Sequence, residues 1–443
     1  MARRRRAARL PADPVAIEIT ALSHDGRGIG RVEGKTVFVD GALPGEQVNF
    51  LYTQRRGRFD EGRALEVLRA SPERVTPRCP HAAVCGGCSL QHQAPQAQIL
   101  TKQGVLLEQL QHFGQVQPDT LLPPLTGPEF GYRRKARLGV KYVFKKETAL
   151  VGFREKRNSF LAEIDQCHVL TEDIGLRISE LRSLVASLEG REALPQIEVA
   201  RGDDATALVL RHLAPLSAAD QARIQDFCVT HGFHLYLQPA GPDSVHKVWP
   251  EGAERLHYQL PDFGLTLAFH PLDFTQVNQA INRRMVELAL ALLDVRSDER
   301  VLDLFCGLGN FTLPLATNAA EVIGVEGEKA MVERGRENAR LNGLNNVAFH
   351  AADLTRPLTE TPWGQLGFDK ILIDPPRSGA LEVVTRMTEL KPRRIVYVSC
   401  NPATLARDAG VLRERGYGLR QAGVMDMFPH TTHVESIAVF EPD

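Results

Sequence analysis

The sequence predicts a multidomain α/β protein: a small all-β barrel comes first, a central α+β region follows, and the C-terminal domain alternates parallel strands with helices. Three observations predict this order. Apolar residues alternate in the β manner over residues 15–70, three cysteines lie within residues 79–88, and strands alternate with helices after Val277. A chain of 443 residues has room for about three domains of ordinary size.

Composition and charge narrow the function classes. No apolar run approaches the roughly 18 residues of a membrane helix, so we expect a soluble, cytoplasmic protein. The net charge is −1, yet residues 1–80 carry 15 Lys and Arg against 10 Asp and Glu, and residues 127–160 carry 10 against 3. This local positive charge favours a polyanionic partner, although a charge run is more often a solvated face.

The N-terminal segment reads as a basic, disordered arm over residues 1–12 and a barrel over residues 13–74. The turn signals around Gly26–Arg31 and Val39–Glu46 resemble the TRAM domain, an OB-like barrel that binds RNA. The resemblance implies that exposed arginines of the barrel face phosphates, which position an RNA without reading its sequence. These arginines are Arg55, Arg56, Arg58 and Arg63.

The cysteine group Cys79, Cys85 and Cys88 predicts a metal centre. Seven cysteines in so long a chain do not make a disulfide framework, whereas the flexible Gly86-Gly87 pair lets neighbouring thiolates point inward. A fourth ligand is required, and the best candidate is Cys167, the nearest unassigned cysteine downstream. Four thiolates suit either zinc or an iron–sulfur cluster, although the spacing is unlike the paired C-x₂-C of common zinc folds.

Residues 92–125 predict a helix with an apolar face, ended by Gly114 and Pro123-Pro124. After it, Tyr132–Val140 and Leu150–Glu155 predict a hairpin whose basic face also carries aromatic residues. Such a face suits splayed RNA bases, and an ordinary half-exposed sheet with its aromatics in the core explains the pattern equally well. The aromatic residues are Tyr132, Tyr142, Phe144 and Phe153. Residues 171–270 continue as mixed helix and strand.

The C-terminal third predicts a nucleotide-binding α/β fold. The loop after strand 300–305 holds Gly307 and Gly309, and Glu326 ends the next strand, where a carboxylate accepts hydrogen bonds from ribose. The third glycine of a pyrophosphate binder is missing, which fits S-adenosylmethionine. Two more strands end at Asp353 and Asp374. The Asp374-Pro-Pro turn fits a methyltransferase acting on a flipped base, but Arg377 replaces the aromatic expected for methylation of an exocyclic amine.

Residues 394–404 contain the strongest chemical candidate. Apolar residues over 395–398 predict a buried parallel strand, and Asn401-Pro402 turns the chain sharply. Cys400 should therefore project from the carboxyl end of the strand, where open α/β sheets place their chemistry. A buried, inert cysteine is the commoner alternative for such a stretch taken alone.

Five motifs together resemble the RNA uracil carbon-5 methyltransferase family, and with the barrel and the four cysteines the resemblance covers nearly the whole chain, closest to the members that act on 23S ribosomal RNA. It implies a Rossmann-like class I methyltransferase domain of residues 92–125 and 271–443, and a central iron–sulfur and RNA-recognition domain of residues 75–91 and 126–270. The motifs are Phe274–Asn278, Asp303–Gly309, Asp374–Arg377, Val398–Pro402 and Thr432–Glu435.

The resemblance also implies the residue roles. Cys400 is the nucleophile that adds to carbon 6 of uracil, and Glu435 is the base that removes the carbon-5 proton. The S-adenosylmethionine contacts are Gln276, Phe305, Asn310, Glu326, Asp353 for the adenine amine, and Asp374 beside the methionine end and the target base. The metal is a 4Fe–4S cluster on Cys79, Cys85, Cys88 and Cys167. Cys228 and Cys306 are read as packing residues.

The expected partner is a single-stranded or bulged uridine of 23S ribosomal RNA that is flipped into the site, and we expect a monomer. The same chemistry on a different 23S uridine or on tRNA is the nearest alternative. Radical methylthiotransferases also carry TRAM-like domains, but they use a C-x₃-C-x₂-C motif, and the spacing here is C-x₅-C-x₂-C. A non-catalytic RNA-binding role leaves Cys400 and Glu435 together unexplained.

Overall fold

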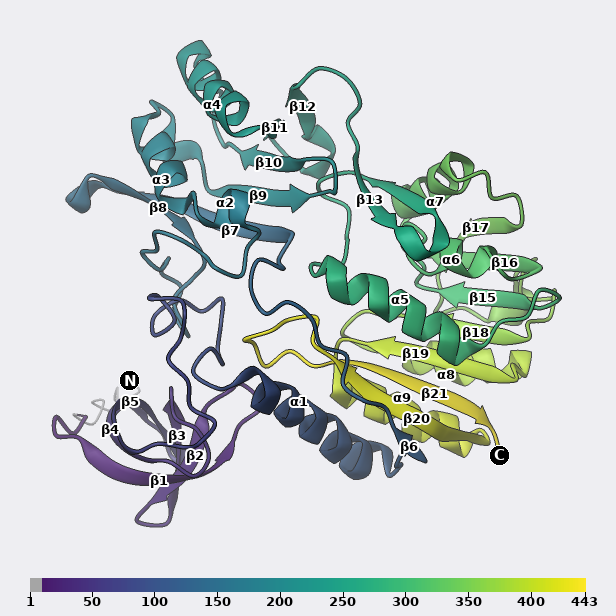
Figure 1. The fold of residues 1–443 in the computed structure, drawn as a ribbon, viewed down its shortest axis with the longest axis horizontal. Coiled ribbons are helices and arrows are strands. Elements are labelled where there is room, and N and C mark those ends of the chain that lie inside the picture. Colours follow the sequence, from purple (N-terminus) through teal and green to yellow (C-terminus); the bar gives the residue numbers. More distant parts are fainter. Residues whose placement is uncertain (1–9) are drawn as a thin grey trace, which may run out of the picture. The chain divides into compact units, whose positions relative to one another are not determined.

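The computed structural model describes residues 10–443, so most of the predicted arm of residues 1–12 lies outside the described residues. The chain divides into two compact units (Figure 1). The first holds the chain up to Thr101, with the short segments Glu155–Asn158 and Pro429–Thr432, and the second holds the rest. The four-part division predicted from the sequence is finer than this, and its boundaries stay predictions. No helix within residues 10–443 is long and apolar enough to cross a membrane.

The first unit contains the predicted barrel, which closes in the order β1-β2-β3-β5-β4. Its core holds the alternating apolar residues of the strands, among them Ile17, Val37 and Phe50. A Cβ on Gly30 would come within 2.4 Å of the Glu18 carbonyl oxygen, so glycine is what lets β1 and β2 approach. The strands are β1 Val15–Leu22, β2 Gly28–Val32, β3 Lys35–Asp40, β4 Gln47–Arg55 and β5 Phe59–Arg69.

The predicted helix between residues 92 and 125 is confirmed over α1 (Pro95–Gln109) and a π-helical turn (Leu110–Gly114). The turn stops where predicted, because Gln115 takes a left-handed conformation with φ 50°. The remaining part contains the two-residue strand β6 (Thr120–Leu121), which pairs in parallel with β20 (Tyr417–Met425) of the second unit's large sheet. A strand of two residues carries too little alternation to be predicted from sequence.

The second unit contains a six-stranded sheet in the order β12-β11-β10-β9-β7-β8. The predicted hairpin is confirmed, since β7 and β8 pair antiparallel. Its aromatic residues differ in exposure. Tyr132 is 5% exposed, as expected for an aromatic residue in the core, and Phe144 is 62% exposed, as expected for one on an accessible face. The elements are β7 Lys135–Val143, β8 Thr148–Gly152, α2 Glu172–Gly175, α3 Ile178–Ser187, β9 Gln196–Arg201, β10 Thr206–Arg211, α4 Ala218–His231, β11 Phe233–Gln238 and β12 His246–Trp249.

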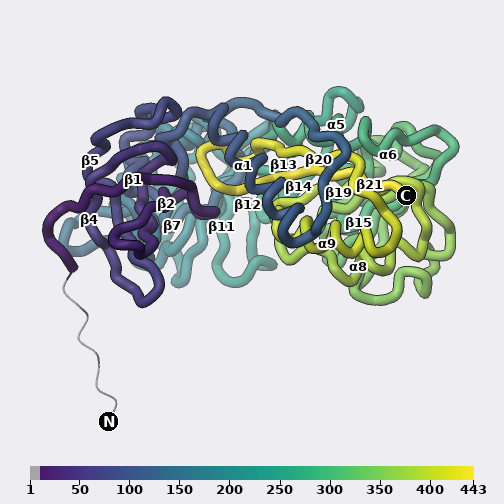
Figure 2. The backbone as a smooth tube through the Cα atoms, turned by 90° about the horizontal axis from the view of Figure 1, so that it is seen from below, coloured from purple at the N-terminus to yellow at the C-terminus, as the bar shows by residue number. Residues whose placement is uncertain are grey.

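The predicted α/β fold is an eight-stranded sheet in the order β17-β16-β15-β18-β19-β21-β20-β6. Strand order reverses between β15 and β18, which is where open α/β sheets bind ligands. Figure 2 shows α5 on one side of this sheet and α8 and α9 on the other. The elements are α5 Gln279–Leu293, β15 Arg300–Leu304, α6 Thr312–Ala316, β16 Glu321–Glu326, α7 Lys329–Leu341, β17 Val347–Ala351, β18 Lys370–Ile373, α8 Leu381–Met387, β19 Arg394–Ser399, α9 Pro402–Glu414, β20 and β21 Glu435–Pro442.

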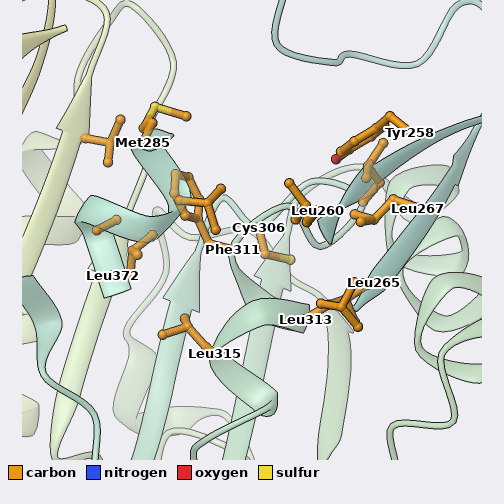
Figure 3. Packing of buried hydrophobic residues seen from close by; sticks show 14 of the residues in the cluster. Tyr258, Leu260, Leu265, Leu267, Met285, Cys306, Phe311, Leu313, Leu315 and Leu372 are labelled. Atoms are coloured by element: carbon orange, nitrogen blue, oxygen red, sulfur yellow. The ribbon is translucent and has the colours of Figure 1, made fainter. Parts of the chain in front are cut away.

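The core of this sheet is closed by a separate hairpin of β13 (Leu256–Leu260) and β14 (Leu265–Phe269). Figure 3 shows residues of one buried cluster. They include Tyr258 and Leu267 of the hairpin, Met285 of α5, and Phe311, which directly precedes α6. Cys306 lies in the same buried cluster at 5% exposure, and Cys228 in α4 is fully buried. Cys228 is therefore placed as a packing residue, whereas Cys306 packs in the core and also lines the pocket described below.

Candidate active site

A pocket of about 480 Å³ lies in the second unit at the carboxyl ends of β15, β16, β18 and β19. The residues that directly follow or end these strands line it, because parallel strands bring their carboxyl ends to one edge of a sheet. Of the eight residues predicted for catalysis and cofactor binding, seven line this one pocket: Gln276, Phe305, Asn310, Glu326, Asp374, Cys400 and Glu435.

Cys400 follows the last residue of β19, a strand whose apolar residues are all fully buried. The chain then turns into α9 because Asn401 caps that helix, accepting from the Ala403 N–H at 3.1 Å, and Pro402 begins it. The Asn401 amide also donates to the Arg377 carbonyl at 3.0 Å, which joins the two strand-end loops. Burial raises the pKa of the Cys400 thiol to about 11, the carboxylates of Glu435 and Asp374 add to this, and Arg377 opposes it.

Glu435 is the first residue of β21 and is 3% exposed. Within residues 10–443 its carboxylate has no cation at ion-pair distance. Burial therefore raises the pKa of Glu435 to about 8, the charge of Asp374 raises it further, and Arg377 and Lys102 oppose the shift. Burial likewise raises the pKa of Asp374 to about 7. Carboxyl groups that titrate near neutral pH are suited to general acid–base work.

Lys102 of α1 is a residue that the sequence analysis missed. Its side chain is 2% exposed, and its ammonium donates to Asp426 at 2.6 Å and to the Phe428 carbonyl at 2.9 Å. It thereby anchors the segment that carries Phe428, His433 and Glu435 to the pocket. The available signal was helical spacing, because Lys102 lies one turn before the buried Leu106 and so on the apolar face of α1.

The glycine loop after β15 carries the cofactor candidates. Phe305 has φ 62°, a conformation that non-glycine residues rarely adopt and that is often found at functional sites. Glu326 accepts backbone N–H groups from Gly307 at 3.2 Å, Gly327 at 2.7 Å and Glu328 at 3.0 Å. Its carboxylate is thus oriented at the pocket wall, where a ribose can donate to the remaining lone pairs.

Asn310 and Asp303 support this loop from inside the core. The Asn310 amide exchanges hydrogen bonds with Asn282 and accepts from the Tyr258 hydroxyl at 2.9 Å. Asp303 is fully buried and accepts from the Thr312 hydroxyl at 2.6 Å, and burial raises its pKa to about 8. Tyr258 and Asn282 were not predicted as site residues, because their partner Asn310 is distant in sequence. Asp303 was not assigned a role either, although its partner Thr312 lies nine residues away.

Asp353 is the one predicted contact that does not line the pocket. It lies beyond the end of β17, its side chain is 55% exposed, and it accepts from the Thr355 hydroxyl at 2.7 Å. The edge of the sheet leaves this side chain in solvent. Its contact with an adenine amine stays a prediction.

The predicted metal ligands divide between the two units. Cys79, Cys85 and Cys88 lie in one loop of the first unit, and Cys167 belongs to the second. Cys79 and Cys85 are half-buried, and Cys88 and Cys167 are buried. Within residues 10–443 no three His, Cys, Asp or Glu side chains form a ready metal site, so the cluster prediction is not confirmed. The donor chemistry nevertheless fits a thiolate cluster. The N–H of Gly87 points to the Cys85 Sγ at 3.4 Å. Burial raises the pKa of the Cys79 thiol, and the backbone N–H groups of His81 and Ala82 oppose this by hydrogen bonding to its sulfur.

The four predicted arginines of the barrel are all exposed. Arg55 and Arg56 lie 3.5 Å from Asp60 and 3.4 Å from Glu61. Within residues 10–443, Arg58 and Arg63 have no acidic partner at ion-pair distance. Exposed guanidinium groups of this kind can contact phosphates.

Comparisons with known proteins agree with this arrangement. Residues 259–441 match the tRNA (Uracil-5-)-methyltransferase family, and residues 14–65 match the TRAM domain. The chain is 60% identical over 442 residues to the 23S rRNA (uracil(1939)-C(5))-methyltransferase RlmD of Alcanivorax borkumensis, covering 100% of this chain and 99% of that protein. It is 53% identical to the RlmD of Xanthomonas campestris pv. campestris, covering 98% of each.

Among solved structures, the fold is similar to that of the Pyrococcus abyssi tRNA (uracil-54, C5)-methyltransferase, which was determined in complex with S-adenosyl-L-homocysteine. The TM-score is 0.73, the sequences are 24% identical, and the match covers 96% of this chain and 100% of that one. The likeness supports the fold of both the barrel and the large sheet.

Proposed function

The chain belongs to the RNA uracil carbon-5 methyltransferase family, and we propose that it methylates carbon 5 of a uridine in 23S ribosomal RNA with S-adenosylmethionine. One observation carries the proposal more than any other. Cys400 and Glu435 line a single pocket together with Asp374 and the candidate cofactor residues. A thiol and a base on one target ring are what substitution at carbon 5 of uracil requires.

The residues of the glycine loop fit S-adenosylmethionine. Glu326 would accept the ribose hydroxyls, Phe305 and Asn310 would border the nucleoside, and Gln276 and Asp374 would border the methionine end. When bound, this group supplies an electrophilic methyl on a sulfonium sulfur. The pocket volume of about 480 Å³ lies within the range of small-molecule sites.

The chain's own residues then act in sequence. The Cys400 Sγ forms a bond to carbon 6 of uracil, and the carbon 5–carbon 6 π electrons move onto the ring as an enolate, which makes carbon 5 nucleophilic. Arg377 favours the thiolate that this addition needs, because it opposes the raised pKa of Cys400. After carbon 5 has taken the methyl group, Glu435 accepts its proton, the double bond re-forms, and the bond from carbon 6 to Sγ breaks.

The substrate assignment rests on the relatives and on charge. The related RlmD proteins are named for a uracil of 23S rRNA, and the exposed Arg58 and Arg63 suit an RNA backbone. We propose that the target uridine is flipped out of its stack, since an enzyme that reacts with a base must first take that base out of the stack.

We also propose a 4Fe–4S cluster held by Cys79, Cys85, Cys88 and Cys167. The grouped thiols and the N–H groups directed at their sulfurs support it. The proposed reaction contains no redox step, so the cluster's role here is structural. Protein purified without oxygen should be brown and contain about four irons per chain. Colourless protein with one zinc per chain would exclude the assignment.

RNA that carries 5-fluorouridine at the target tests the covalent mechanism. Fluorine replaces the proton that Glu435 must remove, so elimination cannot follow and the enzyme should stay attached to the RNA. A denaturing gel should show a shifted protein–RNA band for the wild type and none for Cys400→Ala. A shifted band with Cys400→Ala would exclude Cys400 as the nucleophile.

A further inference from the structure

A second cavity, of about 270 Å³, lies wholly within the first unit. The outer part of β5 forms one wall, with Ala64, Leu65 and Val67. The loop that contains Cys79 and Cys85 forms the opposite wall through Ala82 and Ala83. The proposed methylation pocket shares no residue with this cavity, and no step of the proposed reaction uses it.

The inner end of the cavity holds an unsatisfied imidazole. His92 is 7% exposed, and its Nε2 is buried with no hydrogen-bond partner within residues 10–443. Burial and the nearby cations Arg74 and Lys156 lower the pKa of His92 to about 4, so the ring is neutral at physiological pH. A neutral imidazole nitrogen can donate or accept one hydrogen bond, and leaving it unpaired in a buried place costs free energy.

The remaining lining combines apolar side chains and the cations Arg63, Arg74 and Lys156 with the polar Gln91 and the carboxylates of Asp40 and Glu66. Gln91 already accepts from the Cys79 N–H at 3.1 Å, and Asp40 lies 3.5 Å from Arg157. Leu65 is 58% exposed and so offers an accessible apolar surface at this wall. At the rim, Arg63 and Lys156 have no acidic partner at ion-pair distance within residues 10–443. Arg74, in contrast, is held by Glu46 at 2.5 Å and by the Gly41 carbonyl at 2.7 Å.

These features match the parts of one nucleotide. A base has two apolar faces and a polar edge, and its phosphate carries the charge, so the apolar side chains, the unpartnered His92 Nε2 and the cations Arg63 and Lys156 suit these parts in that order. The volume of 270 Å³ is close to the lower limit for small-molecule sites, which fits one nucleotide and excludes a folded partner.

We propose that this cavity binds one unstacked base of the RNA substrate at a nucleotide other than the methylated uridine. The His92 Nε2 hydrogen-bonds the edge of that base, and Arg63 and Lys156 contact the adjoining phosphate. The inference rests on the proposed RNA substrate and adds to it a second point of base recognition, on the barrel and the cysteine loop.

The test combines a filled cavity with RNA that lacks one base at a time. Ala83→Trp places a large ring in the cavity, and Ala70→Trp is the matched control, because Ala70 is also exposed but does not line the cavity. Binding of substrate RNA oligonucleotides is measured with an abasic nucleotide at each position around the target uridine. For the wild type and Ala70→Trp, one abasic position should weaken binding about tenfold.

For Ala83→Trp, intact RNA should bind about tenfold more weakly than to the wild type, and the same abasic position should cause no further loss. His92→Phe keeps the ring and removes Nε2, so it should weaken binding of intact RNA and of the other abasic RNAs, but not of that one. Equal thermal unfolding of the variants shows that they are folded.

Two results would overturn the inference: Ala83→Trp binding intact RNA as tightly as the wild type, or an abasic profile that is the same in both proteins. The proposed function fails differently, because it fails when the wild type forms no 5-methyluridine from saturating RNA and S-adenosylmethionine. Normal methylation by the wild type with no effect of Ala83→Trp on binding would therefore reject the cavity alone.

Discussion

The barrel and the proposed methylation pocket both bury carboxylates, but the pKa values of these carboxylates shift in opposite directions. Glu46 and Asp60 of the barrel are 0% and 1% exposed, and Glu435 of the pocket is 3% exposed. Burial alone would raise the pKa of all three. The pKa of Glu46 and of Asp60 is nevertheless lowered, whereas the pKa of Glu435 is raised to about 8.

Partners explain the difference. Glu46 accepts from the Arg74 guanidinium at 2.5 Å and from the Leu43 N–H at 2.8 Å, and Asp60 accepts from Lys35 at 2.6 Å. These hydrogen bonds and charges outweigh burial. For Glu435, only the more distant charges of Arg377 and Lys102 oppose the effect of burial, so the carboxyl group keeps its proton to higher pH. The buried, paired carboxylates are thus held ionised within the fold, and the buried, unpaired Glu435 is a candidate for proton transfer.

The largest expected change in stability is in the barrel, where Glu46→Gln leaves the half-buried Arg74 charge without its buried counterion. We expect a loss of about 3 kcal/mol in the free energy of unfolding. The folded pKa of Glu46 is lowered, so its contribution is present above the unfolded value of 4.5 and is lost as pH falls through the folded pKa. Urea unfolding at pH 7 measures it. Glu18→Gln is the control, because the Glu18–Arg69 pair is exposed and contributes less than about 1 kcal/mol.

The second prediction concerns the pH dependence of catalysis. Glu435 must be ionised to accept the carbon-5 proton, and its pKa is raised to about 8. The Cys400 thiol, with its pKa raised to about 11, must also ionise, so release of tritium from RNA carrying 5-tritiated uridine should rise about a hundredfold per pH unit below pH 8 and about tenfold per unit above it, with a bend near pH 8.

The double variant Lys102→Met/Asp426→Asn removes a buried ion pair as a unit, and Lys102 is, after Arg377, the second of two cations that lower the Glu435 pKa. The bend should move to higher pH in this variant. A bend that stays in place would show that Lys102 does not act on Glu435.

The third prediction is that replacing Glu435 changes the free energy of unfolding in the direction opposite to that expected for Glu46. In Glu435 the folded pKa lies above the unfolded value of 4.5, so the native state loses stability as pH rises from about 4.5 to about 8. Glu435→Gln removes this loss and should raise the free energy of unfolding by about 1 kcal/mol at pH 9. The gain should be smaller at pH 6. Destabilisation at pH 9, as expected for Glu46→Gln, would contradict the assignment of Glu435 as unpaired.

The smallest effect is expected at the surface of the barrel. Arg58→Gln removes one exposed cation with no acidic partner at ion-pair distance within residues 10–443. RNA binding should weaken a few-fold, and the slope of log K against log salt should fall by about 0.7, the value for one phosphate contact of a single strand. Binding titrations from 50 to 200 mM salt measure it. An unchanged slope would remove Arg58 from the RNA surface.

Much of the fold followed from local pattern. Strand alternation predicted the barrel, and the order of strands, glycines and acids predicted the parallel sheet. Each of these patterns is local, because it is formed by residues close to one another in the sequence. Cys400, Glu326 and Asp374 were found for the same reason, since each stands at the end of a buried strand.

Features that depend on distant segments were missed. Lys102 has its partner Asp426 more than 300 residues away in the chain, and β6 takes its partner from β20. Asp353 was predicted from its position after a strand, but β17 is the edge of the sheet, where the side chain stays in solvent. The ends of the strands can be predicted from the sequence, but the order of the strands in the folded sheet is needed to know which ends share a pocket.

The account depends most on Glu435 acting after methyl transfer, and one measurement tests this directly. Glu435→Gln is mixed with unmodified RNA and S-adenosylmethionine, and the products are separated on a denaturing gel and examined by mass spectrometry. The account predicts a covalent protein–RNA complex that already carries the methyl group, because the carbon-5 proton cannot leave. Released 5-methyluridine at the wild-type rate, or a complex without the methyl group, would contradict it.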